Sequence, residues 1–147
     1  MKAKIISELR RKLEVRLDEL NDELRSLKDS QADDEKSSAG DKYETGREMT
    51  QQEIDKIEVQ MEMNLAHQSE LKRLMSVDNT GMAGQGAVVK TSGGIYFLAF
   101  AFGKLEVDGT TVFVLSTESP VGALMVGRKP GDAFTFNMRE FKIESVE

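Results

Sequence analysis

The sequence predicts an α+β protein, in which a long N-terminal antiparallel helical hairpin precedes a small β-rich domain with one short helix. Three observations lead to this prediction. Apolar residues recur at helical spacing over residues 1–76, the same segment holds no proline, and the apolar period changes after a glycine-rich stretch. We therefore expect the hairpin at 1–76, a linker at 77–86 and the β-rich domain at 87–147.

The helical half carries two apolar series with steps of three and four residues, the spacing of a coiled-coil seam. The first series is Ile6, Leu9, Leu13, Leu17, Leu20, Leu24 and Leu27. The second series is Ile54, Ile57, Met61, Leu65, Leu71 and Met75, with polar Gln68 between the last two. Charged residues occupy the positions away from the seam, as expected for solvated helix faces.

The two series pair in an antiparallel sense around one reversal point. The residue numbers of each pair sum to 77 or 78 for Leu24 with Ile54, Leu20 with Ile57, Leu17 with Met61, and Leu13 with Leu65. The reversal therefore lies near residue 39, inside the tip segment SSAGDKYETG at residues 37–46. About 30 residues in each arm, at a rise of about 1.5 Å per residue, give a rod of about 45 Å.

The pattern of the C-terminal half predicts strands and one short helix. The expected strands are GAVVKT, a long or bent IYFLAFAFGKLEV with a break near Gly103, TTVFVLS, DAFTFNM and FKIESV. Asp108-Gly109 is a hairpin turn signal. In SPVGALMVG, Ser119 suits the N-cap, Pro120 the first helical position and Gly127 the helix exit. We expect this helix to pack on an antiparallel sheet of about five strands.

Composition excludes several classes of function. The 147 residues include no cysteine and one histidine, which rules out disulfides, thiolate metal sites and a histidine-based zinc cluster. The net charge of −6 and the lack of a basic block disfavour independent binding to duplex DNA. No apolar run reaches the roughly 18 residues of a membrane span, and no secretory signal is recognisable. We expect a cytoplasmic protein that does not bind membranes.

The tip segment holds two carboxylates three residues apart, Asp41 and Glu44. On one helical turn they would face the same way, and paired carboxylates suit Mg²⁺, a hard ion that prefers oxygen ligands. The same pattern also fits a variant capping box, with Asp41 as N-cap of the second helix and Glu44 at its third position. The residues themselves leave both interpretations open, and one Asp oxygen could cap while the other stays free. The preceding Asp33, Asp34 and Glu35 are expected to be a solvated charge run.

Two motifs on this architecture resemble the Gre transcript-cleavage factors of bacterial RNA polymerase. The tip residues 40–44, Gly-Asp-Lys-Tyr-Glu, resemble the family's tip pattern of Gly-Asp, two variable residues and Glu. Residues 119–132, SPVGALMVGRKPGD, resemble its C-terminal signature of a Ser-Pro helix, a glycine, a basic pair and Gly-Asp. The resemblance covers nearly the whole chain.

The resemblance implies an FKBP-like C-terminal domain that docks at the rim of the polymerase secondary channel. The hairpin would enter that channel, and Asp41 and Glu44 would help hold the second magnesium ion of the polymerase. The protein would then be an accessory factor and not an enzyme, with no cofactor of its own. Lys42 and Arg47 could contact the transcript RNA backbone near the tip, or be ordinary surface charges. The motif residues Ser119, Pro120, Gly122 and Gly127 would be mainly structural within the partner-binding region.

Other functions remain open from the sequence. Thr45-Gly46 stands where many family members have Asn-Ala, and the approach to the tip is acidic. These departures favour, as an alternative, a channel-occupying transcription inhibitor that does not stimulate cleavage. A generic coiled-coil adaptor and a peptidyl-prolyl isomerase are further alternatives, the latter suggested only by the FKBP-like fold. The sequence does not specify an oligomeric state.

Overall fold

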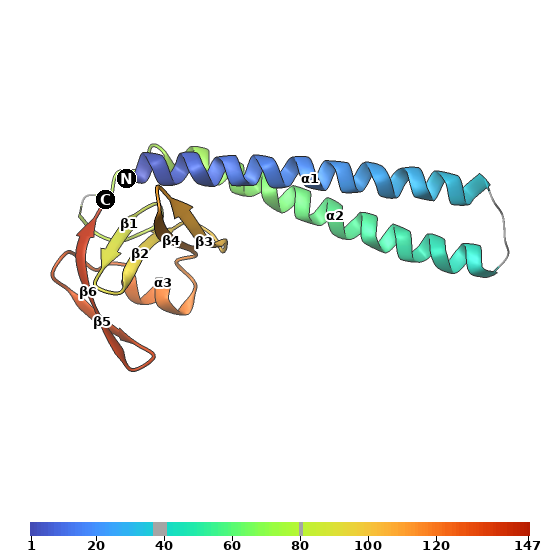
Figure 1. Ribbon diagram of the computed structural model, residues 1–147. Coiled ribbons are helices and arrows are strands. Elements are labelled where there is room, and N and C mark those ends of the chain that lie inside the picture. Colours follow the sequence, from blue (N-terminus) through green and yellow to red (C-terminus); the bar gives the residue numbers. More distant parts are fainter. Residues whose placement is uncertain (37–40, 80) are drawn as a thin grey trace. The chain divides into compact units, whose positions relative to one another are not determined.

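The protein has an α+β fold, which confirms the predicted fold class. The computed structural model describes the backbone of residues 1–36, 41–79 and 81–147, and the side chains in these ranges except 34–36 and 41–44. Two long helices, α1 (Lys2–Lys36) and α2 (Asp41–Leu74), come before a six-stranded sheet. One short helix, α3 (Pro120–Met125), lies in the sequence between its fourth and fifth strands (Figure 1).

The chain divides into two compact units. The hairpin unit comprises residues 11–68, and the sheet unit comprises residues 1–10 together with 69–147. The start of α1 and the end of α2 therefore belong to the same unit as the sheet. The irregular segment after α2 is packed into this unit, since Ala83 is buried and exchanges main-chain hydrogen bonds with Gly127 and Arg128, each of 2.8 Å.

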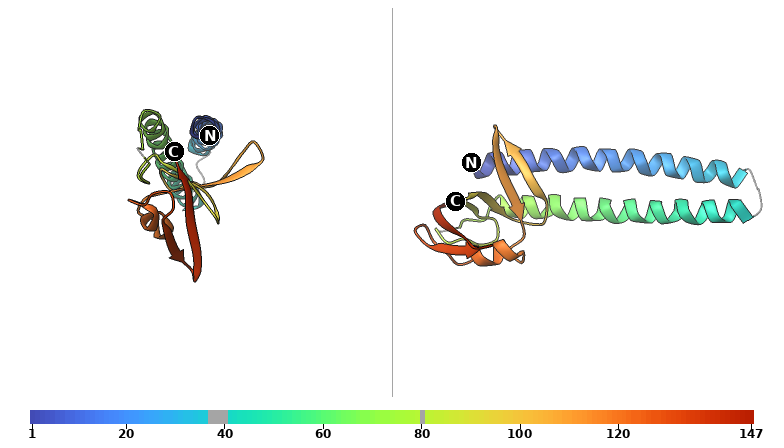
Figure 2. Two further views of the ribbon diagram at one scale, coloured as in Figure 1. Left: turned by 90° about the vertical axis from the view of Figure 1, so that its left-hand side faces the viewer. Right: turned by 60° about the horizontal axis from the view of Figure 1, so that its bottom comes forward.

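The hairpin unit is built on the predicted seam. Its α1 and α2 segments run antiparallel (Figure 2). Leu13 and Leu20 of α1 and Ile54 and Ile57 of α2 are buried. Their spacing of three and four residues keeps one stripe of each helix against the other, so that burial of this stripe stabilises helices whose outer faces are polar.

Two predicted seam residues, Leu65 and Met75, are wrong. Leu65 is 51% exposed, whereas its neighbour Asn64 is only 5% exposed. After Met61 the seam takes a step of three residues, as heptad spacing requires, and reaches Asn64 before Gln68. The apolar pattern pointed to Leu65 because the residue at the correct spacing is polar. Met75 keeps the heptad step of four residues from Leu71, yet it lies just beyond the end of α2 and is 55% exposed, whereas Leu74 is buried.

The sheet has one strand more than expected and is not purely antiparallel. Its strands are β1 (Val88–Thr91), β2 (Gly94–Leu98), β3 (Gly103–Val107), β4 (Thr110–Leu115), β5 (Ala133–Phe136) and β6 (Arg139–Val146). Their order is β3-β4-β2-β1-β6-β5. IYFLAFAFGKLEV forms two strands, because residues 99–102 leave the sheet and Gly103 has a φ of +112°. The chain then returns so that β4 pairs in parallel with β2, while the other pairings are antiparallel.

Two of the three hairpins in the sheet close through a pair of residues with positive φ. Asp108 and Gly109, with φ of 50° and 78°, join β3 to β4. Asn137 and Met138, with φ of 52° and 61°, join β5 to β6. Positive φ at both central residues matches the right-handed twist of the flanking strands, which confirms the turn predicted at Asp108-Gly109.

Alternating strand residues fill the space between the sheet and α3. The buried members of this core are Ala83, Ala87, Val89, Tyr96, Leu98, Met125, Phe134, Phe141 and Ile143. Strand residues of the opposite parity, such as Phe97, Val112 and Val114, are buried as well. Figure 1 shows α3 on one side of the sheet and the start of α1 on the other. The sheet is therefore covered on both faces within its own unit.

Candidate functional site

The tip residues predicted to carry function lie at the start of α2, which begins at Asp41. Asp41, Lys42 and Glu44 therefore belong to the first turn of this helix, but their side chains lie outside the described residues. The choice between a capping box and a carboxylate pair rests on those side chains and stays a prediction. Arg47, one turn further along, is exposed on α2.

The C-terminal motif forms the capped start of α3, as the sequence predicted. The Ser119 side-chain oxygen accepts a hydrogen bond from the Gly122 N–H (3.1 Å) and donates one to the Ser116 carbonyl (2.6 Å). Pro120 follows as the first helical residue, where its missing N–H would have no intrahelical partner anyway. These contacts fix the point at which the chain leaves β4 and enters α3.

Two glycines of the motif are required by backbone geometry. A Cβ atom on Gly122 would lie 2.1 Å from the Ser116 carbonyl oxygen, so no other residue fits without backbone movement. Gly127 has a φ of +82°, in the left-handed region that suits a helix exit. Its N–H donates to the Ala83 carbonyl (2.8 Å), which ties the end of α3 to the segment that follows α2. The geometry thus gives Ser119, Pro120, Gly122 and Gly127 structural roles.

The basic pair after α3 also has contacts within the sheet unit. Arg128 donates from Nε to the Leu124 carbonyl (2.5 Å) and from a terminal nitrogen to the Ala133 carbonyl (3.0 Å). The Asp132 carboxylate accepts from the Lys129 N–H (2.9 Å). These bonds hold the loop between α3 and β5 in shape.

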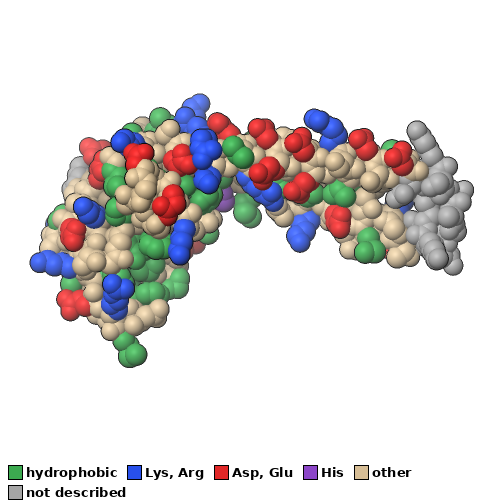
Figure 3. Space-filling view, in the orientation of Figure 1, with side chains coloured by type: hydrophobic (Ala, Val, Ile, Leu, Met, Phe, Trp, Pro, Cys, Tyr) green, Lys and Arg blue, Asp and Glu red, His purple; other side chains and the backbone are tan. Residues whose placement is uncertain are grey.

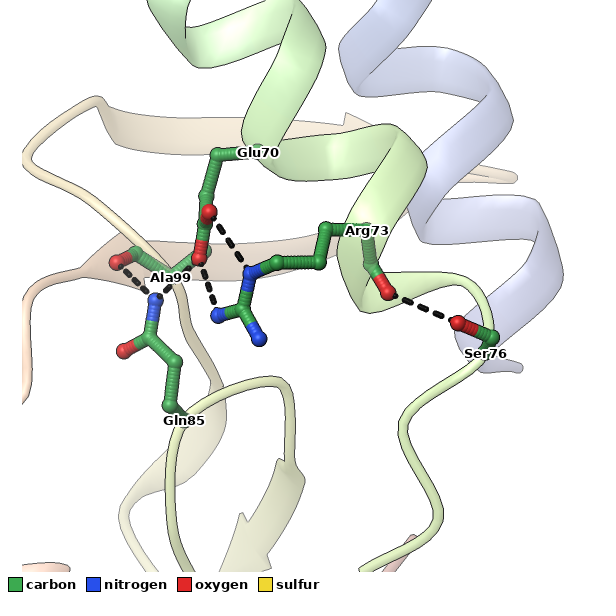
Figure 4. A network of polar contacts seen from close by, with 5 residues as sticks. All are labelled: Glu70, Arg73, Ser76, Gln85 and Ala99. Carbon is green, nitrogen blue, oxygen red and sulfur yellow. Dashed lines mark hydrogen bonds and ion pairs between the residues drawn. The ribbon is translucent and has the colours of Figure 1, made fainter.

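A polar network that the sequence did not reveal joins the end of α2 to the sheet (Figure 4). Arg73 donates two hydrogen bonds to the Glu70 carboxylate, at 3.0 and 2.6 Å. The Gln85 amide donates to the same carboxylate (3.1 Å) and to the Ala99 carbonyl (2.8 Å). The hydrogen bonds from Arg73 are the main cause of a lowered pKa for Glu70. No sequence pattern links these positions, because Gln85 lies in an irregular segment.

A second group of hydrogen-bonded polar side chains lies in the seam of the hairpin unit. The Asn64 amide donates to the Leu13 carbonyl (2.9 Å), and Gln68 donates to the Asn64 side-chain oxygen (2.7 Å). Such a buried and satisfied polar residue in a seam is a known means of specifying helix register. Strict heptad counting from Met61 would have located it.

In the described part of the chain, no group of three or more His, Asp or Glu side chains is placed so that it could hold a metal ion. The half-buried His67 on α2 has a pKa lowered by burial. In the same residues, no helix combines the length and the apolar character needed to cross a bilayer.

The two predicted site regions belong to different parts of the fold. The tip acids lie in the hairpin unit, and the C-terminal motif lies in the sheet unit. In comparisons with known proteins, no protein-family model and no curated protein sequence matches this chain.

Proposed function

We propose that this protein binds in the secondary channel of bacterial RNA polymerase and stimulates cleavage of backtracked transcripts. The observation that carries the proposal is the antiparallel hairpin, in which Asp41 and Glu44 lie in the first turn of α2. Because α2 begins at Asp41, these residues lie at one end of the paired helices. The resemblance of both motifs to the Gre-type factors supplies the partner.

The proposed chemistry uses the tip carboxylates in trans. In two-metal phosphoryl chemistry, a metal ion activates the attacking water or stabilises the leaving oxygen. Asp41 and Glu44 offer the oxygen ligands that Mg²⁺ prefers and stand one helical turn apart in the sequence. Their role would be to retain the second magnesium ion of the polymerase, so that the polymerase itself cuts the RNA. The protein would then need no cofactor of its own and would not be an enzyme.

The remaining parts of the chain have supporting roles in this proposal. The sheet unit, for which we propose an FKBP-like fold, would dock at the channel rim through the region around Ser119 and Pro120. Lys42 and Arg47 would contact the transcript backbone near the tip. The net charge of −6 agrees with a factor that reaches nucleic acid only through its partner. A cytoplasmic location follows from the proposed partner.

A second candidate function is inhibition of transcription by occupying the channel. It is favoured by the acidic run Asp33-Asp34-Glu35 before the tip and by Thr45-Gly46 after it. Both candidates share the fold and the partner, and they differ in whether cleavage accelerates. RNA shortening in stalled, backtracked elongation complexes separates them: the first predicts faster cleavage on adding the protein, whereas binding without acceleration supports the second.

A further inference from the structure

The outer face of α2 carries apolar side chains that are exposed among the residues the structure describes. Met49 is 61% exposed, Val59 58% and Met63 56%. Val59, Met63 and the exposed Ala66 follow the i, i+4, i+7 spacing of one helix face. Met49 lies two heptads before Met63, but the exposed Lys56 occupies the position between them, so Met49 stands apart from this row. We call Val59, Met63 and Ala66 the α2 outer face.

This face is distinct from the seam. The buried seam residues Ile54 and Ile57 occupy different heptad positions from Val59 and Met63, so α2 is apolar on two sides. A solvated helix normally carries polar residues opposite its packed stripe. Figure 3 shows hydrophobic side chains reaching the surface along the hairpin unit, beside acidic ones. An exposed apolar row with a polar border is typical of an interaction site.

The charges beside the row indicate what kind of partner fits. Glu48, Asp55 and Glu62 are exposed and repeat every seven residues, so they form an acidic row next to the α2 outer face. From residue 48 to 66 the helix carries five carboxylates and one lysine, Lys56. In a two-fold antiparallel pairing of two copies over this face, equivalent acidic rows would lie side by side and repel. The same row attracts a cationic partner.

We propose that the α2 outer face binds a cationic amphipathic helix of another protein. Its apolar side chains would pack between Val59 and Met63, and its lysines or arginines would face the acidic row. The proposal goes beyond the function proposed above, because it uses neither Asp41 nor Glu44. Either one can therefore fail without the other.

Binding can be measured by fluorescence anisotropy with the full chain. The probe is a labelled helical peptide of about 18 residues, or five turns, with leucine on one face and lysine on the other. A scrambled peptide of the same composition and a leucine–glutamate version are the controls. We expect the lysine peptide alone to bind, with an affinity that falls as salt rises.

Variants locate the binding surface. Val59→Ser with Met63→Ser should lower the affinity by at least about tenfold, as expected when central apolar anchors are truncated. Val15→Ser, which changes an exposed valine on α1, is the matched control and should bind normally. Asp55→Lys with Glu62→Lys should weaken binding of the lysine peptide and create binding of the glutamate peptide. This charge-reversal variant keeps the proposal testable if the serine variant loses helicity.

Several outcomes would overturn the proposal. They are equal binding of the scrambled peptide, unchanged affinity in Val59→Ser/Met63→Ser with intact helicity, and an equal loss in Val15→Ser. A further outcome that would overturn the proposal can be measured by sedimentation velocity. A concentration-dependent dimer that disappears in the Val59→Ser/Met63→Ser protein would assign the face to a second copy of this chain instead.

Discussion

The side-chain amide of Asn64 on α2 donates a hydrogen bond of 2.9 Å to the main-chain carbonyl of Leu13 on α1. This bond crosses the seam of the hairpin unit at a position where coiled coils usually carry an apolar residue. Asn64 is buried, and its side-chain oxygen is also satisfied, by Gln68. The contact therefore fixes which residues of the two helices face each other.

The first prediction concerns the stability cost of this polar residue. Asn64→Ala should lower the free energy of unfolding by about 1 to 2 kcal/mol, because it removes a satisfied hydrogen bond and leaves a small cavity. Asn64→Leu should raise it by roughly 1 kcal/mol, since an apolar residue replaces a polar one in the seam. Urea unfolding followed by circular dichroism measures both. A leucine variant less stable than the alanine variant would contradict this assignment.

The second prediction tests the seam register directly. Leu20→Ala should destabilise the protein by about 2 to 4 kcal/mol, because Leu20 is fully buried in the seam. Leu65→Ala should change the stability by less than about 0.5 kcal/mol, because Leu65 is largely exposed. The two variants remove the same atoms, so each is the control for the other. Similar losses for both would mean that Leu65, and not Asn64, faces α1.

The third prediction concerns Gly122 at the start of α3. Gly122→Ala should cost at least about 2 kcal/mol of unfolding free energy, because its Cβ would overlap the Ser116 carbonyl oxygen. Gly127→Ala is the matched control. It meets no atom within 4 Å but has a positive φ, so it should cost only about 1 kcal/mol. Equal and small effects in thermal unfolding would show that the α3 entrance tolerates a side chain.

The fourth prediction is a pH dependence that comes from Glu70. Hydrogen bonds from Arg73 lower its folded-state pKa below the ordinary 4.5. A carboxyl with a lowered folded-state pKa adds stability above its unfolded pKa, and this stability is lost as pH falls through the folded-state pKa. Because the pair lies at the surface, the effect should be at most about 1 kcal/mol.

Glu70→Gln isolates this contribution. Urea unfolding at pH 7 and at pH values from 5 down to 3 should show that the wild-type protein loses more stability on acidification than the variant does. The two proteins should converge once the wild-type carboxyl is protonated. Parallel pH curves with a constant gap would rule out a contribution from Glu70 ionisation.

The sequence predicted the fold where local rules dominate. The seam spacing located the antiparallel pairing, and Ser119, Pro120 and Gly127 marked the limits of α3 because capping depends on a few adjacent residues. The tight turn at Asp108-Gly109 followed from the same kind of local chemistry.

Features that depend on distant residues were missed. The parallel pairing of β2 with β4 requires residues 99–102 to leave the sheet, and no periodic pattern records that. Asn64 has no apolar signal, because a polar residue occupies this buried heptad position of the seam. The contact between Gln85 and Glu70 joins an irregular segment to a helix, so it has no sequence signal.

We propose that Asp41 and Glu44 act on the active centre of RNA polymerase, and the most direct test of this proposal is RNA cleavage in backtracked elongation complexes. Asp41→Ala should abolish the acceleration of cleavage and leave polymerase binding unchanged. Glu48→Ala, one turn beyond Glu44 on the same helix, should behave like the wild-type protein. Two results would contradict the proposal. In the first, Asp41→Ala accelerates cleavage as well as the wild type does. In the second, the wild-type protein binds the polymerase but does not accelerate cleavage.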